Sequence, residues 1–281
     1  MLKVALIQMM VTANKSDNLL KACSKIKLAA DKGAKLICLP ECFNCPYGIK
    51  YFPEYCENIP NEKTSKSLSD IAKEHSIWLV GGSIPESREG KIYNTCLVFN
   101  PNGELVGTYS KIHLFDINIP GKMVFQESTT LTAGNKLFSF DIPVDNDKKV
   151  TVGLGICYDV RFAELAHIYT RKHNCNLLLY PGAFNMTTGP LHWELLARFR
   201  AMDNQCYVGL CSTARDENAE YVSYGHSLAA DPWGKVLGSL NEKDDILEFT
   251  VNLDEVDNVR SMIPIGRQRR EDIYTVATEK H

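Results

Sequence analysis

The sequence lacks any apolar run long enough to cross a lipid bilayer. Its apolar stretches, such as Val4–Ile7 and Leu177–Tyr180, are only a few residues long, whereas a membrane-spanning helix needs roughly 20. The first residues also lack the long apolar centre and the small-residue cleavage site of a signal peptide. We therefore expect no membrane partner, and we expect the start of the chain to be a buried strand.

The sequence also lacks an excess of charge of either sign. It has 31 Lys and Arg residues against 34 Asp and Glu residues, which gives a formal net charge of −3. A near-neutral chain has no overall electrostatic attraction to nucleic acid or to anionic membranes. The basic cluster Arg267–Arg270 is short, and such a cluster is typical of a solvated or salt-bridged face. We therefore expect no nucleic-acid partner.

No internal repeat, low-complexity tract or flexible linker divides the 281 residues. Hydrophobic residues make up 44% and charged residues 23%, which are ordinary values for a globular protein. A chain of this length buries a large core without help from metals or disulfides. We therefore predict a single domain over residues 1–281.

The ten cysteines lack the spacing of a disulfide scaffold and of most zinc sites. Secreted disulfide scaffolds are short and loop-rich, and this chain is neither. Among Cys38, Cys42, Cys45 and Cys56, only the pair Cys42–Cys45 has the spacing of a zinc knuckle. We expect free thiols in a reducing cytoplasm, and a partial mitochondrial location stays open. A zinc-binding module is an alternative that metal analysis would decide, and the role of Cys45 is left open.

Short apolar runs alternate with helical stretches along the chain, which predicts an α/β layer fold. Hairpin signals at Pro101–Gly103 and Asp231–Gly234 predict mixed rather than purely parallel sheets. Two stretches, Ile119–Gln126 and Asp145–Lys149, are expected to be loops. The expected helices are Lys15–Lys32 with Gly33 as its cap, Thr64–His75, Arg161–Arg171 and Leu191–Met202. The expected strands are Val4–Met10, Leu36–Leu39, Ile77–Val80, Ile92–Phe99, Glu104–Tyr109, Val150–Ile156, Leu177–Tyr180, Tyr207–Ser212, Tyr224–Ala230, Lys235–Leu237 and Ile246–Leu253.

Three of the expected strands end in reactive side chains: Glu41, Lys111 and Cys157. Because sites of open α/β sheets form beyond the carboxyl ends of strands, these groups could converge. A thiol attacks only as its thiolate, which a nearby carboxylate can generate and a nearby ammonium can stabilise. The ammonium can also stabilise an oxyanion, together with the N–H of Tyr158 if the chain turns sharply there. The set is suited to attack on an amide or a nitrile.

Each of these residues has an ordinary alternative interpretation, as a solvated charge or as a core thiol. A Cys–His hydrolase is a second alternative, since His113 and His192 could supply the base. In that case activity would survive in Glu41→Gln and disappear when the histidine is replaced. A third alternative is a catalytically silent scaffold.

Three segments together resemble the signature blocks of the nitrilase (carbon–nitrogen hydrolase) superfamily. They are Leu39–Glu41, Lys111–Leu114 and Gly155–Phe162, and their order and spacing match. The resemblance extends from Val4–Gln8 to Pro264–Arg270, and it is greatest to the omega-amidase branch. The supporting stretches are Pro46–Gly48, Lys50–Tyr55, Phe125–Ser128 and Tyr180–Pro190. It implies a four-layer αββα sandwich with mixed sheets, usually dimeric, so that a homodimer is expected, and it needs no metal or organic cofactor.

The resemblance also implies roles for the catalytic residues. It makes Cys157 the nucleophile, Glu41 the general base and acid, and Lys111 the oxyanion stabiliser. It makes Glu127 the carboxylate that orients Lys111 and the substrate amide. The reaction it implies is ping-pong and passes through a cysteine thioester.

The substrate pocket follows from the same resemblance. Arg161 is expected to bind the substrate's α-carboxylate, and Tyr158 is expected to contact the substrate through its N–H. Tyr47, Phe184 and Thr187 are expected to line a small pocket, over which the loop 115–126 closes. The implied substrates are monoamides of short dicarboxylates, foremost α-ketoglutaramate and α-ketosuccinamate. Other branches share the triad and act on deaminated glutathione, nitriles or N-carbamoyl compounds, so a deaminated-glutathione amidase is the alternative within the superfamily.

Overall fold

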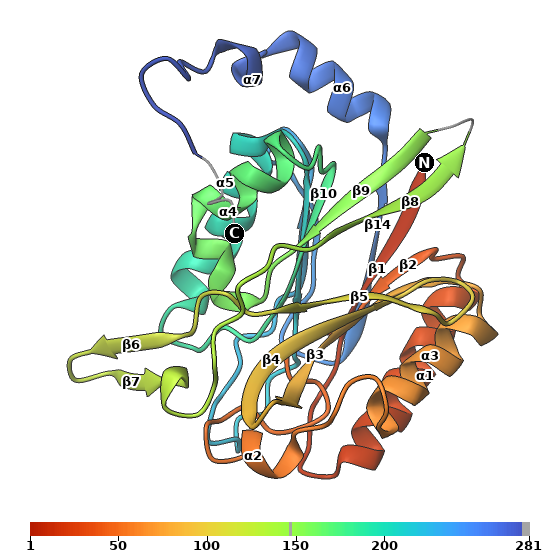
Figure 1. Cartoon of the computed structure of the whole chain (residues 1–281), viewed down its shortest axis with the longest axis vertical. Coiled ribbons are helices and arrows are strands. Elements are labelled where there is room, and N and C mark those ends of the chain that lie inside the picture. The colour runs from red at the N-terminus through yellow and green to blue at the C-terminus, as the bar shows by residue number, and fades with distance from the viewer. Residues whose placement is uncertain (146–147, 277–281) are drawn as a thin grey trace.

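Two six-stranded sheets packed face to face form the centre of the computed structural model, which describes residues 1–145 and 148–276 (Figure 1). The first sheet has the order β14-β1-β2-β3-β4-β5 and the second the order β13-β12-β11-β10-β9-β8. In the first, β1, β2 and β3 run parallel, and in the second, β9, β10 and β11 do. The remaining pairs are antiparallel, so both sheets are mixed, as predicted.

The strands of these sheets are as follows. The first contains β1 (Leu2–Gln8), β2 (Leu36–Cys38), β3 (Trp78–Arg88), β4 (Lys91–Phe99), β5 (Leu105–Ser110) and β14 (Asp245–Val251). The second contains β8 (Ser139–Asp145), β9 (Lys148–Leu154), β10 (Leu177–Gly182), β11 (Tyr207–Ser212), β12 (Leu228–Ala230) and β13 (Val236–Ser239).

Helices cover the outer face of each sheet, which completes the four-layer αββα sandwich. Helices α1 (Lys15–Asp31) and α3 (Lys63–Glu74) cover the first sheet, and α4 (Ala163–Arg171) and α5 (Gly189–Asn204) cover the second (Figure 1). The shorter helices are α2 (Phe52–Tyr55), α6 (Leu253–Met262) and α7 (Ile265–Gln268). No helix of residues 1–145 or 148–276 is long and apolar enough to span a membrane.

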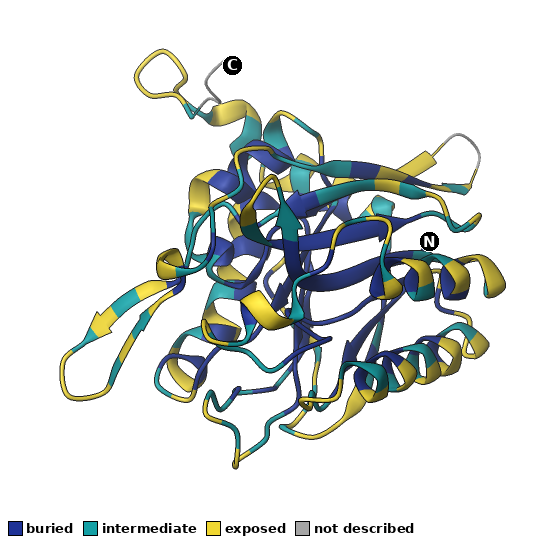
Figure 2. Cartoon of the chain, turned by 60° about the horizontal axis from the view of Figure 1, so that its bottom comes forward, coloured by how far each residue is buried: buried dark blue, intermediate teal, exposed yellow. Residues whose placement is uncertain are grey.

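Alternation along the strands divides the core into layers, because successive side chains of a strand point to opposite faces. Leu6 packs between the sheets, where it meets Leu179 of the second sheet beside Gly209. Its neighbour Ile7 packs in the cluster that α1 and α3 form with the first sheet. The buried residues accordingly follow the strands through the middle of the molecule (Figure 2).

Helix α1 illustrates how local signals set the element boundaries. The side chain of Asn14 accepts hydrogen bonds from the backbone N–H groups of Ser16 and Asp17, which caps the first turn. Gly33 has φ +91°, the left-handed conformation that ends a helix and that glycine adopts most readily. The predicted cap at Gly33 is therefore confirmed, with the helix ending at Asp31.

The prediction of a loop over Ile119–Gln126 is wrong, because these residues belong to a β-hairpin. Strands β6 (Asp116–Ile119) and β7 (Met123–Gln126) pair with each other in a separate two-stranded sheet. The hairpin projects from the body of the molecule (Figure 1), and only alternate residues are partly buried. With so little apolar burial, the segment gives no strong strand signal in the sequence.

Other element boundaries also differ from the sequence-based expectation. Strand β8 was not predicted. In the expected loop Asp145–Lys149, Asp145 belongs to β8, and Lys148 and Lys149 belong to β9. Positions 146–147 of that loop fall outside the described residues. The strand expected over Tyr224–Ala230 shrinks to Leu228–Ala230. The helix expected from Arg161 begins at Ala163, because residues 157–161 form a 3₁₀ turn instead.

Candidate active site

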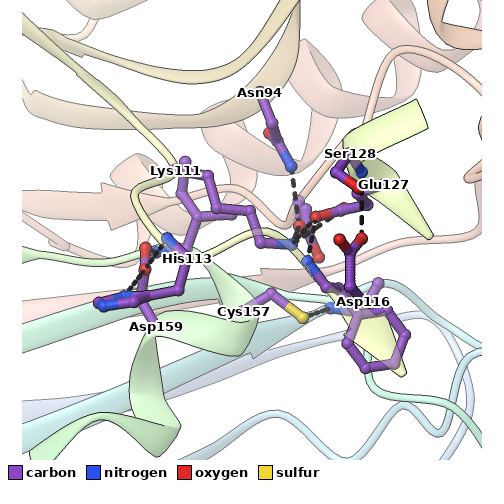
Figure 3. Close-up of polar contacts among 12 residues, drawn as sticks. Asn94, Lys111, His113, Asp116, Glu127, Ser128, Cys157 and Asp159 are labelled. Carbon is purple, nitrogen blue, oxygen red and sulfur yellow. Dashed lines mark hydrogen bonds and ion pairs between the residues drawn. The ribbon is translucent and has the colours of Figure 1, made fainter. Parts of the chain in front are cut away.

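The three reactive strand ends meet in one buried cluster, of which Figure 3 shows Lys111 and Cys157. Glu41 follows β2, Lys111 follows β5, and Cys157 follows β9, so two groups come from the first sheet and one from the second. The Lys111 ammonium lies 3.0 Å from Glu41 Oε1. All three residues are buried, with Glu41 and Lys111 fully inaccessible. The predicted convergence of a carboxylate, an amine and a thiol is therefore present.

Glu127 provides a second carboxylate for the same ammonium. It opens the short 3₁₀ turn Glu127–Thr129 after β7, and both of its carboxylate oxygens lie 3.0 Å from Lys111 Nζ. The N–H of Phe115 donates to Glu127 Oε2 at 2.7 Å, which ties the two ends of the β6–β7 hairpin together. The position predicted for Glu127 beside Lys111 is thus what the geometry provides.

Tyr47 contacts this carboxylate and lines a cavity that also contains Glu41. Its hydroxyl donates to Glu127 Oε1 at 2.5 Å, and its ring stacks on that of Phe125 at 5.8 Å. Tyr47, which was expected to line the substrate pocket, is not among the residues around the thiol of Cys157. A side chain that fixes a buried carboxylate in this way acts by positioning.

The charges of the buried cluster favour an ionised lysine. Burial alone would lower the pKa of Lys111, but the carboxylates of Glu127 and Glu41 outweigh it and hold that pKa well above its ordinary value. Burial raises the pKa of Glu41, an effect that Lys111 opposes and Glu127 adds to. The amide of Asn94 donates to Glu41 Oε1 at 2.9 Å and fixes the carboxylate from the β4 side (Figure 3).

Cys157 lies at a sharply bent point of the chain. Its φ is +48°, in the left-handed region that a residue with a side chain adopts only under constraint. A side chain on Gly155 just before it would lie 2.5 Å from the Tyr180 ring, so only glycine fits there. The N–H of Ala183 donates to Cys157 Sγ at 3.5 Å. The turn thereby presents the thiol to the space between the sheets.

The surroundings of Cys157 favour the neutral thiol over the thiolate. Burial and the charge of Glu41 raise the pKa of Cys157 well above its ordinary value, and Lys111 acts in the opposite direction. A neutral thiol beside a carboxylate of raised pKa forms a donor–acceptor pair for proton transfer. Glu41 is thus in place to take the proton as the sulfur attacks.

Asp159 anchors the nucleophile turn, a contribution that the sequence analysis missed. Its carboxylate accepts from the N–H of Ile156 at 2.8 Å and from the Tyr109 hydroxyl at 2.8 Å. It also accepts from the N–H of His113 at 2.9 Å, and the His113 ring lies 2.7 Å away (Figure 3). These bonds join the turn at Cys157 to the segment that carries Lys111. The sole sequence signal was an acidic residue in an apolar context.

A small cavity of about 160 Å³ opens beside the thiol. Tyr158 and Phe184 line it as expected, but Thr187 does not. The next residue, Thr188, does so instead, because Asn185 Oδ1 accepts from the N–H groups of both threonines and the resulting turn buries only Thr188. The lining residues are Phe115, Cys157, Tyr158, Arg161, Ala183, Phe184, Asn185, Thr188 and Tyr221.

Arg161 supplies the charge of this cavity. Its guanidinium lies 4.8 Å from the centroid of the Phe184 ring and 5.6 Å from that of Tyr158. Nη1 is 3.1 Å from His192 Nδ1, and burial followed by the charge of Arg161 lowers the pKa of that histidine. Within the described residues Arg161 has no carboxylate partner. A substrate anion can occupy that place.

Both histidines that could supply the base in place of Glu41 have other partners. The His113 ring stacks on Phe162 at 3.6 Å and contacts Asp159, while His192 contacts Arg161, so neither imidazole takes the place of Glu41. In the part of the chain that the structure describes, no group of three or more His, Cys, Asp or Glu residues could hold a metal ion. The geometry thus favours a carboxylate as the base of Cys157.

Comparison with known proteins agrees with this geometry. Residues 3–261 match the family model of the carbon-nitrogen hydrolases. Human omega-amidase NIT2 is 55% identical over 278 residues, which cover 99% of this chain and 98% of that protein. Xenopus tropicalis omega-amidase NIT2 is 53% identical over 279 residues and covers 99% of both.

Solved structures show the same architecture. Saccharomyces cerevisiae Nit3, a member of branch 10 of the nitrilase superfamily, superposes with a TM-score of 0.86 at 41% identity over 96% of each chain. The Caenorhabditis elegans NitFhit protein superposes with a TM-score of 0.84 at 35% identity, over 99% of this chain and 68% of that one. Sequence, fold and the geometry around Cys157 therefore agree that this chain belongs to the carbon-nitrogen hydrolase family of the nitrilase superfamily.

Proposed function

We propose that the protein is an omega-amidase that hydrolyses monoamides of short dicarboxylates, foremost α-ketoglutaramate and α-ketosuccinamate. The observation that carries this proposal is Arg161, which has no carboxylate partner among the residues that the structure describes and lies in a small cavity that also contains Cys157. The relatives that are named omega-amidase, at 53% and 55% identity, support the same activity.

The size of the cavity favours a small substrate. The lining side chains leave only about 160 Å³ of empty space beside Cys157, part of it open to solvent. A four- or five-carbon monoamide matches this space much better than deaminated glutathione. The guanidinium fork of Arg161 would bind the carboxylate, because arginine and carboxylate pair through two parallel hydrogen bonds.

In the first half of the reaction, Cys157 Sγ attacks the ω-amide carbon and its proton passes to Glu41. Lys111 and the N–H of Tyr158 stabilise the negative oxygen of the tetrahedral intermediate. Glu41 then gives the proton to the amide nitrogen. The carbon–nitrogen bond breaks, ammonia leaves, and a thioester remains on Cys157.

In the second half, Glu41 takes a proton from water, and the resulting hydroxide attacks the thioester. The second tetrahedral intermediate expels the Cys157 thiolate, which recovers its proton from Glu41. The dicarboxylate leaves, and the enzyme returns to its starting state. Glu127 and Tyr47 keep the Lys111 ammonium in place through both halves.

We also propose that two copies of this single-domain chain form a homodimer in the reducing cytoplasm. Helix α5 supports the dimer, because Leu191, Leu195, Phe199 and Met202 lie three or four residues apart and are each 44–68% exposed. A continuous apolar face of this kind on a surface helix is typical of an interaction surface. Sedimentation of the protein with and without Leu195→Glu measures the association. The ten cysteines are all free thiols, which supports the compartment.

The first test is ammonia release from α-ketoglutaramate by the wild type and by Cys157→Ala. Deaminated glutathione, a simple nitrile and an N-carbamoyl amino acid are assayed beside it. We expect fast, Cys157-dependent release from α-ketoglutaramate only. Preferred turnover of another compound would keep the mechanism and overturn the substrate, and no turnover by the folded, reduced protein would favour the silent scaffold.

A second test isolates Arg161. A hydrogen bond to a charged group contributes about 1.5–3 kcal/mol, so Arg161→Gln should lower kcat/KM for α-ketoglutaramate by about 10–150-fold. Hydrolysis of a short neutral amide should change less than about twofold, since it has no carboxylate to lose. Arg270→Gln is the matched control, because that arginine is exposed and paired with Asp272. Equal losses on the neutral and the anionic amide would refute the carboxylate role.

A further inference from the structure

A second group of cationic side chains gathers far from the thiol, where the end of α4 meets the segment around α7. His167 and Arg171 lie one turn apart on α4, Arg260 lies on α6, and Arg269 follows α7. After α7 the chain turns back toward α4 (Figure 1). These residues interact electrostatically: Arg260 and Arg269 act on Arg171, and Arg269 and Arg171 act on His167.

Several buried nitrogen atoms of this group have no hydrogen-bond partner among the described residues. They are Arg171 Nε and Nη2, Arg269 Nε and His167 Nδ1. The His167 residue is only 9% exposed. Leaving a buried donor unpaired is costly, and buried polar groups of native proteins are nearly always bonded to protein, water or a ligand. So many open donors in one place indicate a missing acceptor.

The arginines also have little compensating negative charge. Within residues 1–145 and 148–276 no carboxylate forms an ion pair with Arg171, Arg260, Arg267 or Arg269. The guanidinium of Arg260 instead bonds two neutral carbonyls, those of Gln205 at 3.2 Å and Cys175 at 2.9 Å. By contrast, the neighbouring Arg270 is held by two bonds to Asp272.

A cleft opens onto Arg171, Arg260 and Arg267, and we call it the arginine cleft. Its lining contains these three arginines and a single acid, Asp257, whereas Arg269 and His167 lie outside the lining, with Glu271 near His167. None of its lining residues belongs to the cavity beside Cys157. The lining residues are Arg171, Gln205, Asp257, Arg260, Ser261, Pro264, Gly266 and Arg267.

We propose that the arginine cleft is a binding site for a compact oxyanion with two negative charges, the chemistry that inorganic phosphate and short dicarboxylates share. Arginine forks match the oxygens of both groups through paired, charge-assisted hydrogen bonds. Such an anion would accept from the open nitrogens of Arg171 and balance the charges of Arg260 and Arg267. A phosphate hydroxyl could also donate to Gln205 Oε1, which has no partner among the described residues.

Isothermal titration of the full chain with phosphate and, separately, with succinate tests this site. The titrations use the Arg161→Gln protein at constant ionic strength, so that succinate does not bind beside Cys157. We expect saturable binding of at least one of the two anions, and the stronger one identifies the preferred ligand. Arg171→Gln should weaken binding by about tenfold or more, whereas Arg88→Gln, whose arginine is paired with Glu86, should change it less than about twofold.

Thermal unfolding of each variant checks that it remains folded. If Arg171→Gln does not fold, Arg267→Gln takes its place, because Arg267 is exposed and also lines the cleft. Absence of saturable binding of both anions would overturn the proposal. So would binding that neither Arg171→Gln nor Arg267→Gln weakens, or binding that an equal concentration of chloride reproduces.

Discussion

Removal of one hydroxyl group, in Tyr47→Phe, tests whether Tyr47 acts by positioning Glu127. The hydroxyl donates to Glu127 Oε1 at 2.5 Å, and both oxygens of this carboxylate lie 3.0 Å from Lys111 Nζ. Phenylalanine keeps the ring and its stacking on Phe125. The substitution therefore removes a single bond from the carboxylate that holds the catalytic ammonium.

The size of the effect follows from the charge and burial of the acceptor. A hydrogen bond to a charged group contributes about 1.5–3 kcal/mol, and each 1.36 kcal/mol of activation free energy is tenfold in rate. If the whole bond supports the position of Lys111, kcat should fall by about 10–150-fold. KM should change less than about threefold, because Tyr47 does not line the cavity beside Cys157.

Steady-state ammonia release from α-ketoglutaramate measures both constants. Tyr51→Phe is the matched control, since the Tyr51 ring packs edge-on against Tyr55 and its hydroxyl forms no hydrogen bond with Glu127 among the described residues. The control should retain kcat within about twofold. A normal kcat for Tyr47→Phe, or a loss equal to that of the control, would show that Tyr47 contributes packing alone.

Three further predictions concern the same site. Asp159→Asn replaces one carboxylate oxygen by an NH₂ group, so the side chain can accept from the N–H of Ile156 or from that of His113 but not from both. It should cost about 1–3 kcal/mol of unfolding free energy in denaturant titration, and an unchanged midpoint would contradict the anchoring role. Burial raises the pKa of Cys157 and Lys111 lowers it, so Lys111→Gln should leave less thiolate and slow the alkylation of Cys157 by iodoacetamide at pH 8. Peptide mass spectrometry follows this reaction, and a faster reaction in the variant would show that Lys111 does not lower the pKa of Cys157. The raised pKa of Lys111 means that the folded chain binds this proton more tightly than the unfolded chain. The contribution of the Lys111 proton to the free energy of unfolding should be complete below pH 10.5 and should decline as the pH rises through the folded-state pKa. If the wild type already loses stability near neutral pH and Lys111→Met does not, this prediction is wrong.

The reactive residues could be predicted because each follows a short apolar run. Leu36–Cys38 and Lys148–Leu154 are buried strands, and the chain leaves the sheet directly at the residues that lead to Glu41 and Cys157. Because sites of α/β sheets form beyond the carboxyl ends of strands, the local pattern predicts reactive groups at one edge of each sheet. That Cys157 of the second sheet meets Glu41 and Lys111 of the first depends on how the two sheets pack, which a local pattern does not show. Assignment of roles to these residues depended on the resemblance to a known family.

The supporting contacts could not be predicted in the same way. Asn94 meets Glu41 from 53 positions along the chain, and Asp159 meets His113 from 46. A single sequence contains no signal for such pairings, although a polar residue in the middle of an apolar strand, as Asn94 is, could have been noted. The error at Thr187 has a different cause, since the turn at Asn185 decides which of two adjacent threonines faces the cavity.

The division of the reactive groups between two sheets has a consequence for when a folding chain becomes active. Glu41 and Lys111 are carried by one sheet and Cys157 by the other, so the nucleophile meets its base only after the sheets close on each other. A chain that is still being made, or one that has partly opened, holds a sulfur with neither partner beside it. The rate of ammonia release is therefore proportional to the fraction of natively folded molecules. Measured across a denaturant series, it reports the fraction of chains in which the two sheets are packed together.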